Sequence, residues 1–376
     1  MAVGAISRRA ITLSLAVLLL GATGVLAHGV HRDENYAFPT PSIECSPETY
    51  ICQRACTPPV IDGVLDEDVW KDVLHTKPFV DIQGDALPEP WFRTTAAMLW
   101  DDDYFYIAAW MVEPHVWAKL TDRDAVIFYD NDFEVFIDPD GDTHEYYELE
   151  VNAFGTEWDL LLTKPYRDGG TAIDSWDIQG LLTGVDVLGT LNDPSDTDEG
   201  WTVEIAIPWK VLEECAHGPC PPEPGDSWRV NFSRVEWRTD VVGGDYVKAT
   251  DPETGERLPE DNWVWSPQGL VNMHYPEMWG VVSFSSSPAG MQEGGAPHPS
   301  DLATRSALMR LYYAQRTFYG RHGRYSGGLE ELGLLEPPFP GAPWPPAIHR
   351  TPWTFEGVLA GPDGTVLHVS EDGHIW

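Results

Sequence analysis

Short runs of alternating apolar and polar residues recur through the middle of the chain, and they constrain its fold more than any other feature. The six clearest runs span residues 94–100, 104–110, 133–137, 145–151, 201–207 and 228–235. Alternation with a period of two buries one face of a β-strand, and Asp- and Gly-containing turns separate the runs. Helical periodicity is weak here, so residues 57–286 are predicted to form a mainly β structure, an antiparallel, jelly-roll-like β-sandwich.

The chain changes character after this region. Residues 287–300 are rich in Ser, Pro and Gly and are typical of a linker. Asp301 is a helix N-cap residue, and apolar residues then recur at helical spacing until residues 320–323. Two strand-like runs at 354–359 and 365–369 are joined by an Asp-Gly turn. Residues 301–376 are therefore predicted to form a small α+β appendage that docks on the sandwich or on a partner.

The N-terminus has the pattern of a secretory signal peptide. Arg8 and Arg9 precede an apolar run, and Ala27 ends a small-residue cleavage site. The paired arginines fit both a general and a twin-arginine export signal. We expect residues 1–27 to be removed and residues 28–56 to form a leader that contains cysteines. The mature protein is then secreted, periplasmic or attached at the cell surface.

The overall charge excludes one class of partner. The 376 residues include 60 Asp and Glu but 23 Lys and Arg, which gives a formal net charge of −37. Such a negative field repels phosphate backbones, so we expect no nucleic-acid partner. The 17 Trp residues fit either core packing or stacking on sugar rings.

Five cysteines follow the signal region. Exported chains form disulfides, and Cys215 and Cys220 flank a tight His-Gly-Pro turn, so these two are predicted to pair. Two of the remaining three can form a second bridge. The spacing of Cys45, Cys52 and Cys56 leaves the choice open.

Seven short blocks stand out in order along the predicted sandwich. They include PVIDGVLDEDVW at the start and NDFEVFID near the middle, and they span residues 59–70, 99–107, 131–138, 146–152, 200–209, 228–234 and 276–280. Together they resemble family 9 carbohydrate-binding modules and their relatives. The resemblance implies a β-sandwich that binds glycans without cleaving them and that is often attached to secreted glycosidases. Residues 311–332 resemble the part of type IV pseudopilins that follows their membrane helix.

The family resemblance also implies candidate ligand-binding residues. Phe128 and Met273 stand where the family has its two stacking Trp residues, so the pair of indoles is not reproduced. Glu134 matches the family's hydrogen-bonding Glu, whereas Glu150 stands where the family has Arg. Loop aromatics are available as replacement ring faces. The predicted set is Phe128, Tyr129, Glu134, Glu150, Asn152, Arg234, Trp237, Trp265 and Met273.

An acidic loop follows one of the predicted strands. Oxygen-rich loops of this kind bind Ca²⁺, although the spacing differs from that of an EF-hand. A solvated acidic turn explains the same residues. The candidate ligands of a structural calcium ion are Asp138, Asp140, Asp142 and Glu145. No other cofactor is expected.

We expect an exported, non-catalytic protein that recognises polysaccharides or oligosaccharides through aromatic stacking and carboxylate hydrogen bonds, as in polysaccharide breakdown. The sequence has no Ser nucleophile elbow, HExxH motif or P-loop. One alternative is an accessory module of a glycoside hydrolase. The other is a haem b-binding electron-transfer subunit of an exported redox enzyme, with Met273 and Met278 as candidate ligands. The C-terminal helix is a candidate contact with a cell-surface or secreted protein complex.

Overall fold

The computed structural model describes residues 33–291, 294–296 and 298–376. The expected signal peptide therefore lies outside the described residues. Within these ranges, no helix combines the length and the apolar character needed to cross a bilayer.

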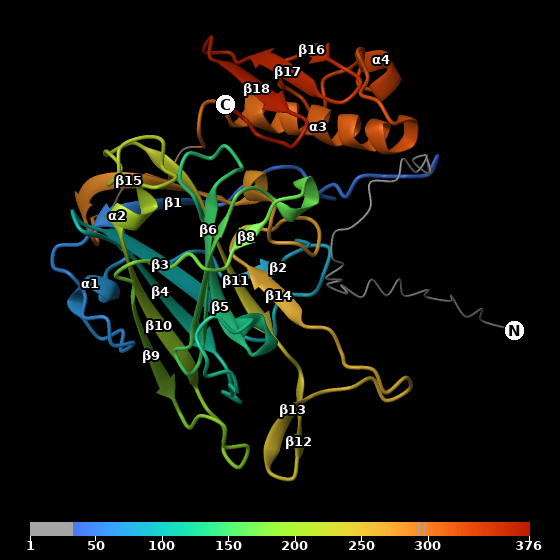
Figure 1. Ribbon diagram of the computed structural model, residues 1–376. Helices are drawn as coiled ribbons and strands as arrows, with labels where there is room; N and C mark the ends of the chain where they lie inside the picture. The colour runs from blue at the N-terminus through green and yellow to red at the C-terminus, as the bar shows by residue number, and fades with distance from the viewer. Residues whose placement is uncertain (1–32, 292–293, 297) are drawn as a thin grey trace, which may run out of the picture.

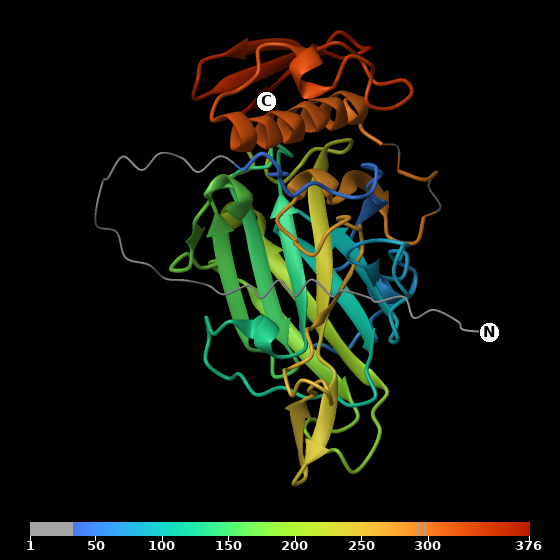
Figure 2. The same cartoon turned by 90° about the vertical axis from the view of Figure 1, so that its right-hand side faces the viewer.

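Two layers of strands pack face to face in the main body of the molecule (Figure 1, Figure 2). The first layer consists of β5 (Asp132–Asp138), β6 (Tyr146–Asn152), β7 (Glu157–Leu162), β8 (Ala172–Ile173), β11 (Ser227–Glu236), β14 (Asp261–Val264) and β2 (Val80–Asp81). The second layer consists of β1 (Thr49–Arg54), β3 (Thr94–Trp100), β4 (Tyr104–Val112), β9 (Leu182–Leu188), β10 (Gly200–Pro208) and β15 (Gly280–Pro288).

Shorter elements connect these strands. They are α1 (Asp68–Lys71), α2 (Trp209–Leu212), the 3-10 turns η1 (Ile127–Tyr129), η2 (Tyr166–Asp168) and η3 (Pro276–Met278), and a hairpin of β12 (Thr239–Val242) and β13 (Asp245–Lys248). The hairpin extends from the body below β11 and β14 (Figure 1).

Hydrogen bonds link the two layers into one continuous sheet that turns back on itself. The order is β8-β7-β6-β5-β11-β15-β1-β3-β4-β10-β9, with β14 and β2 beside β11. The layers join at β11, whose first residues pair with β15 while its last residues pair with β14. The predicted mainly β sandwich is therefore confirmed, and the six predicted runs form β3, β4, β5, β6, β10 and β11.

Strand β1 departs from the expected pattern in two ways. It runs parallel to both of its neighbours, β15 and β3, within an otherwise antiparallel sheet. It also comes from the segment that we treated as a leader. Tyr50 and Cys52 of β1 are buried in the hydrophobic core between the layers. Two inward side chains are too short a pattern to mark a strand by periodicity.

Alternation along β5 decides which side chains reach the core. Phe133, Val135 and Ile137 belong to the cluster between the layers. Their neighbours Asp132 and Glu134 therefore lie on the opposite side of the strand, because successive side chains point to opposite faces. We call this opposite side of β5, β6 and β11 the outer face. All seven residues of β5 are buried, those of the outer face included.

The C-terminal unit covers one end of the sandwich in both views (Figure 1, Figure 2). Helix α3 (Leu302–His322) lies between this end and a three-stranded sheet of β16 (Ala347–Arg350), β17 (Phe355–Ala360) and β18 (Val366–Ser370), with α4 (Leu329–Leu332) nearby. Side chains of α3 share one hydrophobic cluster with Tyr275 and Met278 of the sandwich. The appendage therefore docks on the sandwich, which is one of the two expected arrangements.

Polar groups of η2 and η3 connect the sandwich to α3, and Arg167 on η2 holds one of them in place. Its Nη2 donates to Glu277 at 2.9 Å, and its guanidinium lies 4.0 Å from the ring centroid of Tyr275. The Tyr313 hydroxyl of α3 donates to Glu277 as well, and Arg316 of α3 pairs with Asp168. The Arg167 and Glu277 side chains are 4% and 6% exposed, so a buried ion pair within the sandwich positions the carboxylate that accepts the Tyr313 hydroxyl of α3.

The predicted disulfide between Cys215 and Cys220 is not present, because the described cysteines are all free thiols. The two residues have different partners. The Cys215 N–H donates to the Tyr147 hydroxyl on β6, whereas Cys220 Sγ donates to the Trp209 carbonyl on α2 at 3.2 Å. The tight turn that connects them therefore does not pair their sulfurs.

The first of the seven blocks, residues 59–70, has a structural role here. Glu204 on β10 accepts hydrogen bonds from the Gly63 N–H at 2.8 Å and from Trp70 Nε1 at 2.7 Å. Gly63 has a φ of 89°, and a Cβ there would lie 2.4 Å from the Val185 backbone. A residue without a side chain is required at this close approach. The block therefore anchors the loop before α1 to β10.

Candidate functional site

Four carboxylates lie together on the outer face. Glu134 on β5 is directly opposite Glu150 on β6 and, on its other side, opposite Ser233 on β11. Asp132 and Glu148 occupy the same face one pleat away in each strand. Their exposed fractions are 0% for Asp132, 5% for Glu134, 6% for Glu148 and 1% for Glu150. We call these four residues the carboxylate cluster.

The carboxylate cluster has no cationic partner. No ion pair among the described residues includes any of its members. Burial raises the pKa of Glu134 to about 7 and raises the pKa values of Asp132, Glu148 and Glu150 well above their usual range. A site of this kind can accept hydrogen bonds from hydroxyl groups or coordinate a cation.

Aromatic residues border the carboxylate cluster. The Phe128 N–H donates to Glu150 Oε2 at 2.9 Å, which places η1 directly beside the cluster. Tyr129 follows on the same turn and is 50% exposed. Trp158 on β7 is directly opposite Glu150. The face of Trp237 is covered by Lys248, whose Nζ lies 3.4 Å from the ring centroid. Tyr129 is therefore the predicted aromatic residue with the most accessible ring.

Three residues of the predicted ligand set have structural roles. Arg234 is fully buried on the core side of β11, where it pairs with Glu113 and Glu236. Trp265 is 2% exposed and belongs to the core between the layers. The Asn152 amide donates to Leu120 and Asp130, and its oxygen accepts from two backbone N–H groups. Arg234 and Trp265 face the core, whereas Asn152 lies opposite Asp132 on the outer face with its amide already hydrogen-bonded. A ligand-binding role for these three residues stays a prediction.

The two candidate haem ligands, Met273 and Met278, lie in different hydrophobic clusters. Met273 is 7% exposed and packs on the outer face in a cluster with Phe136 and Trp279. Met278 belongs to the cluster that joins the sandwich to the C-terminal unit. Met273 therefore covers the upper part of the outer face and offers no stacking surface.

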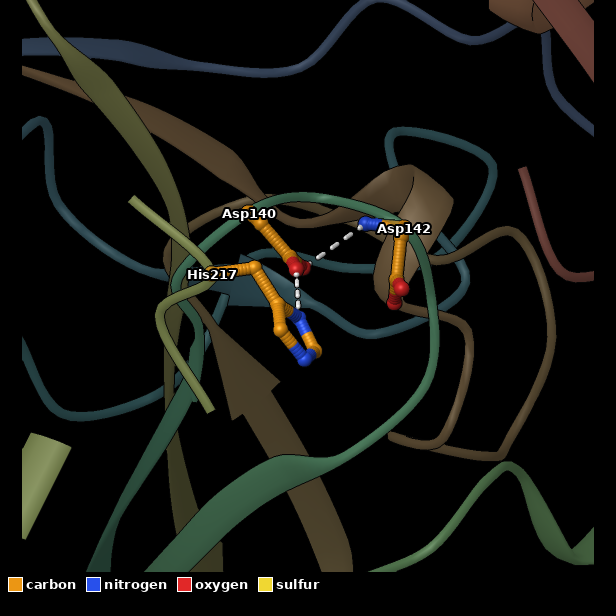
Figure 3. Close-up of side chains that lie close together, drawn as sticks. All are labelled: Asp140, Asp142 and His217. Carbon is orange, nitrogen blue, oxygen red and sulfur yellow. Dashed lines mark hydrogen bonds and ion pairs between the residues drawn. The ribbon is translucent and has the colours of Figure 1, made fainter. Parts of the chain in front are cut away.

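The acidic loop between β5 and β6 differs from the expected calcium site. Both oxygens of Asp138 accept backbone N–H groups of the loop, from Gly141 and Thr143, so Asp138 stabilises the turn. Asp140 and Asp142 converge with His217, which follows α2 (Figure 3). Glu145 has a side chain that is 54% exposed and lies 3.8 Å from His217 Nε2.

The hydrogen bonds of this loop are already satisfied within the protein. Asp140 Oδ2 lies 2.6 Å from His217 Nδ1, and Asp142 Oδ2 lies 2.8 Å from His374 Nε2. The hydrogen bond to Asp140 raises the pKa of His217. Sequence reasoning missed His217, because no local spacing connects it to a loop more than seventy residues earlier. A calcium ion at this loop stays a prediction.

A cavity of about 210 Å³ lies between the sandwich and α3. It is lined by side chains from both parts, including Cys45, Arg229, Glu277, Met309 and Tyr313. These residues belong to the junction described above. The cavity therefore reflects how the C-terminal unit packs on the sandwich.

The carboxylate cluster lies within a stretch of the chain that matches a known family. Residues 61–220 match one family model. Its description is "Carbohydrate family 9 binding domain-like". We call residues 61–220 the CBM9-like domain, after carbohydrate-binding module family 9. This domain contains η1, β5 and β6, and with them Phe128, Tyr129 and the whole carboxylate cluster.

Two curated relatives align with 157 residues of the chain, or 41% of its length. "Exoglucanase XynX" of Acetivibrio thermocellus is 29% identical over 12% of its own length. "Endo-1,4-beta-xylanase A" of Thermoanaerobacterium saccharolyticum is 27% identical over 11% of its own length. The chain therefore matches a small part of each relative.

Two solved structures are also similar. One is a CBM9 module of Caldicellulosiruptor kristjanssonii in complex with cellotriose, with 17% identity, a TM-score of 0.41, and coverage of 66% of this chain and all of that one. The other is a putative carbohydrate-binding protein of Bacteroides uniformis, with 17% identity, a TM-score of 0.44, and coverage of 64% and 100%. The family match ends at residue 220, so the pseudopilin resemblance of the C-terminal unit stays a prediction.

Proposed function

We propose that this protein is an exported, non-catalytic carbohydrate-binding protein whose CBM9-like domain binds saccharides at the outer face. The family match over residues 61–220 carries this proposal. The matched stretch includes both strands of the carboxylate cluster and the turn with Phe128 and Tyr129. Carboxylates accept strong hydrogen bonds from sugar hydroxyls, and an aromatic ring packs on the apolar face of a sugar.

The chemistry of the relatives indicates which saccharides to test. One curated relative is named an exoglucanase and the other an endo-1,4-β-xylanase. We therefore propose β-linked glucan and xylan chains as the ligand class. Tyr129 provides the accessible ring face, and Glu134 accepts hydrogen bonds from the sugar hydroxyls.

The relatives also favour a second role. Both curated relatives are named as glycoside-cleaving enzymes, and the matched stretch covers 12% or less of each. The CBM9-like domain would then act as an accessory module that keeps such an enzyme on its polysaccharide. Both roles take place outside the cytoplasm and require no catalytic residue in this chain.

Calorimetric titration with cello- and xylo-oligosaccharides tests the proposal. We expect saturable binding that Tyr129→Ala weakens by at least about tenfold, because stacking on an aromatic ring contributes on the order of 1 kcal/mol or more. Trp353→Ala is the matched control, since Trp353 is 71% exposed on the C-terminal unit. The Trp353→Ala variant should bind as the unmodified protein does. Absence of binding to every glucan and xylan tested, or full binding by Tyr129→Ala, would overturn the proposal.

A further inference from the structure

The carboxylate cluster brings acidic oxygens unusually close together. One oxygen each of Asp132, Glu134 and Glu150 lies within 4.8 Å of the other two. All three side chains come from the two neighbouring strands β5 and β6, whose backbone hydrogen bonds fix their spacing. Their separation is therefore set by the sheet and does not depend on flexible loops.

Burial makes this arrangement costly unless the negative charge is neutralised. Transfer of an ionised carboxylate from water to the protein interior is unfavourable, and like charges at close range add to that cost. Lys248 is a nearby cation, but its ammonium group lies on the ring of Trp237 and pairs with no member of the cluster. Neutralisation must come from bound protons or from a bound cation.

Unpartnered oxygen atoms in the cluster favour the cation. Asp132 Oδ2 and Glu148 Oε2 are buried and accept or donate no hydrogen bond among the described residues. Protonated carboxyl groups would be expected to use these atoms as hydrogen-bond partners, because buried polar atoms are rarely left unpaired. Asp132 has no exposed surface, so bulk water does not reach its free oxygen.

We propose that Asp132, Glu134 and Glu150 bind a divalent metal ion on the outer face, with Ca²⁺ as the preferred ion. The ligands are all oxygens, which suits Ca²⁺ better than Zn²⁺ with its preference for nitrogen and sulfur. Oxygens on opposite sides of a Ca²⁺ ion lie about 5 Å apart at most, since Ca–O distances are about 2.3–2.6 Å. The 4.8 Å limit within the cluster satisfies this condition.

The free atoms complete the coordination. Ca²⁺ takes about six to eight oxygen ligands, more than three carboxylates supply when each gives one oxygen. Glu148 Oε2 is an unpartnered buried oxygen on the same face, and the Ser233 hydroxyl lies opposite Glu134. Water molecules fill the remaining positions. The acidic loop of Asp140, Asp142 and His217 is a weaker candidate, because Asp140 already bonds to His217 and Asp142 to His374.

Terbium luminescence provides a direct test without saccharide. Tb³⁺ is a calcium mimic that emits when an excited indole lies nearby, and Trp158 is directly opposite Glu150. We titrate the full exported chain, freed of metal with EDTA, with TbCl₃ and then displace Tb³⁺ with CaCl₂. Saturable emission that Ca²⁺ reverses is expected. Calcium should also raise the melting temperature by at least about 3 °C.

Matched variants locate the ion. Glu134→Gln and Glu150→Gln keep the side-chain volume and remove charge, so both should fold and both should lose at least about tenfold in Ca²⁺ affinity. Glu356→Gln, on β17 far from the cluster, should bind Ca²⁺ normally. The proposal is overturned if no ion binds, or if Asp140→Asn abolishes binding while Glu134→Gln and Glu150→Gln retain it.

This inference concerns the same face as the proposed function but does not depend on it. The ion is measured directly, in the absence of sugar. If the protein binds Ca²⁺ through the carboxylate cluster but binds none of the glycans tested, the ion site is supported and the proposed function is contradicted. A protein that binds glycans through Tyr129 without any ion would do the reverse.

Discussion

Glu134 on β5 and Glu150 on β6 lie directly opposite one another, and both carboxylates are buried. Like charges in directly opposed positions destabilise a sheet. The pair persists because the surrounding strands hold it within the outer face of a well-packed sandwich. Its neutralisation therefore links the stability of the protein to pH and to bound cations.

The first prediction concerns pH in the absence of metal. Burial raises the pKa of Glu134 to about 7 from the value of 4.5 of a free glutamate. The folded state therefore binds this proton more tightly, so its contribution to stability is complete below pH 4.5 and is lost as the pH rises toward 7. The loss approaches about 3 kcal/mol at the upper limit.

Urea unfolding in EDTA at pH 5 and at pH 7.5 measures this effect. The Glu134→Gln variant cannot lose the proton, so its free energy of unfolding should fall less between the two pH values than that of the unmodified protein. Glu260, which also raises the pKa of Glu134, and the other carboxyl groups of the cluster remain in both proteins. Identical pH dependence of the two proteins would contradict the prediction.

The second prediction concerns the junction with the C-terminal unit. Arg167→Ala leaves Glu277 buried without its counter-ion, and removal of one partner of a buried pair costs about 3–5 kcal/mol. Urea unfolding should show this loss, and limited proteolysis should cut the 287–300 segment faster. Arg324→Ala is the control, because the Arg324–Glu331 pair is largely exposed and should contribute little. Equal effects of the two substitutions would show that the buried Arg167–Glu277 pair does not stabilise this part of the protein.

The third prediction concerns the loop before α1. Glu204→Ala removes the acceptor of the Trp70 indole and of the Asp62 and Gly63 N–H groups. Buried donors without a partner cost about 1–3 kcal/mol each, so the variant should lose on the order of 2–4 kcal/mol in urea unfolding. Glu256→Ala, at an exposed position, should unfold as the unmodified protein does. A fully stable Glu204→Ala variant would show that the loop is held by other contacts.

The fourth prediction concerns the thiols. Denatured protein without reductant should react with Ellman's reagent at five sites, because each described cysteine is free. In the native protein, exposed Cys56 should react first. Cys52 should react last, because it is fully buried and burial raises its pKa well above the usual range. A Cys215–Cys220 cross-link in the peptide mass spectrum would reinstate the disulfide expected from the sequence.

Local patterns were sufficient for most of the elements. The strands at 133–137 and 201–207 and the helix from Asp301 follow from periodicity and capping, which operate over a few residues. Strand β1 was not predicted from the sequence. Its six residues place only two apolar side chains in the core, and the strands that it pairs with come from distant parts of the chain. Parallel pairing of this kind cannot be recognised from the local sequence.

The site was predicted less completely than the fold. Motif position correctly brought Glu134 and Glu150 together, because residues in register on paired strands must meet. Arg234 was adjacent to Ser233 in sequence, but alternation turns its side chain to the opposite face, where Glu113 and Glu236 hold it. Trp265 packs in the core between the layers, a position that the sequence did not reveal because a loop aromatic cannot be distinguished from a core aromatic without the packing.

The amino-acid sequence by itself determined that this chain forms a β-sandwich with a helical appendage, because backbone periodicity and turn residues act locally. It also determined the acidic character of the chain, with a formal net charge of −37. Only the tertiary structure decided that Asp132 and Glu148 join Glu134 and Glu150 as buried carboxyl groups without a cationic partner, and that Glu277 and Asp168 accept hydrogen bonds from α3. Burial and ion pairing depend on which residues from the rest of the chain surround each side chain. A local sequence pattern contains no information about those residues.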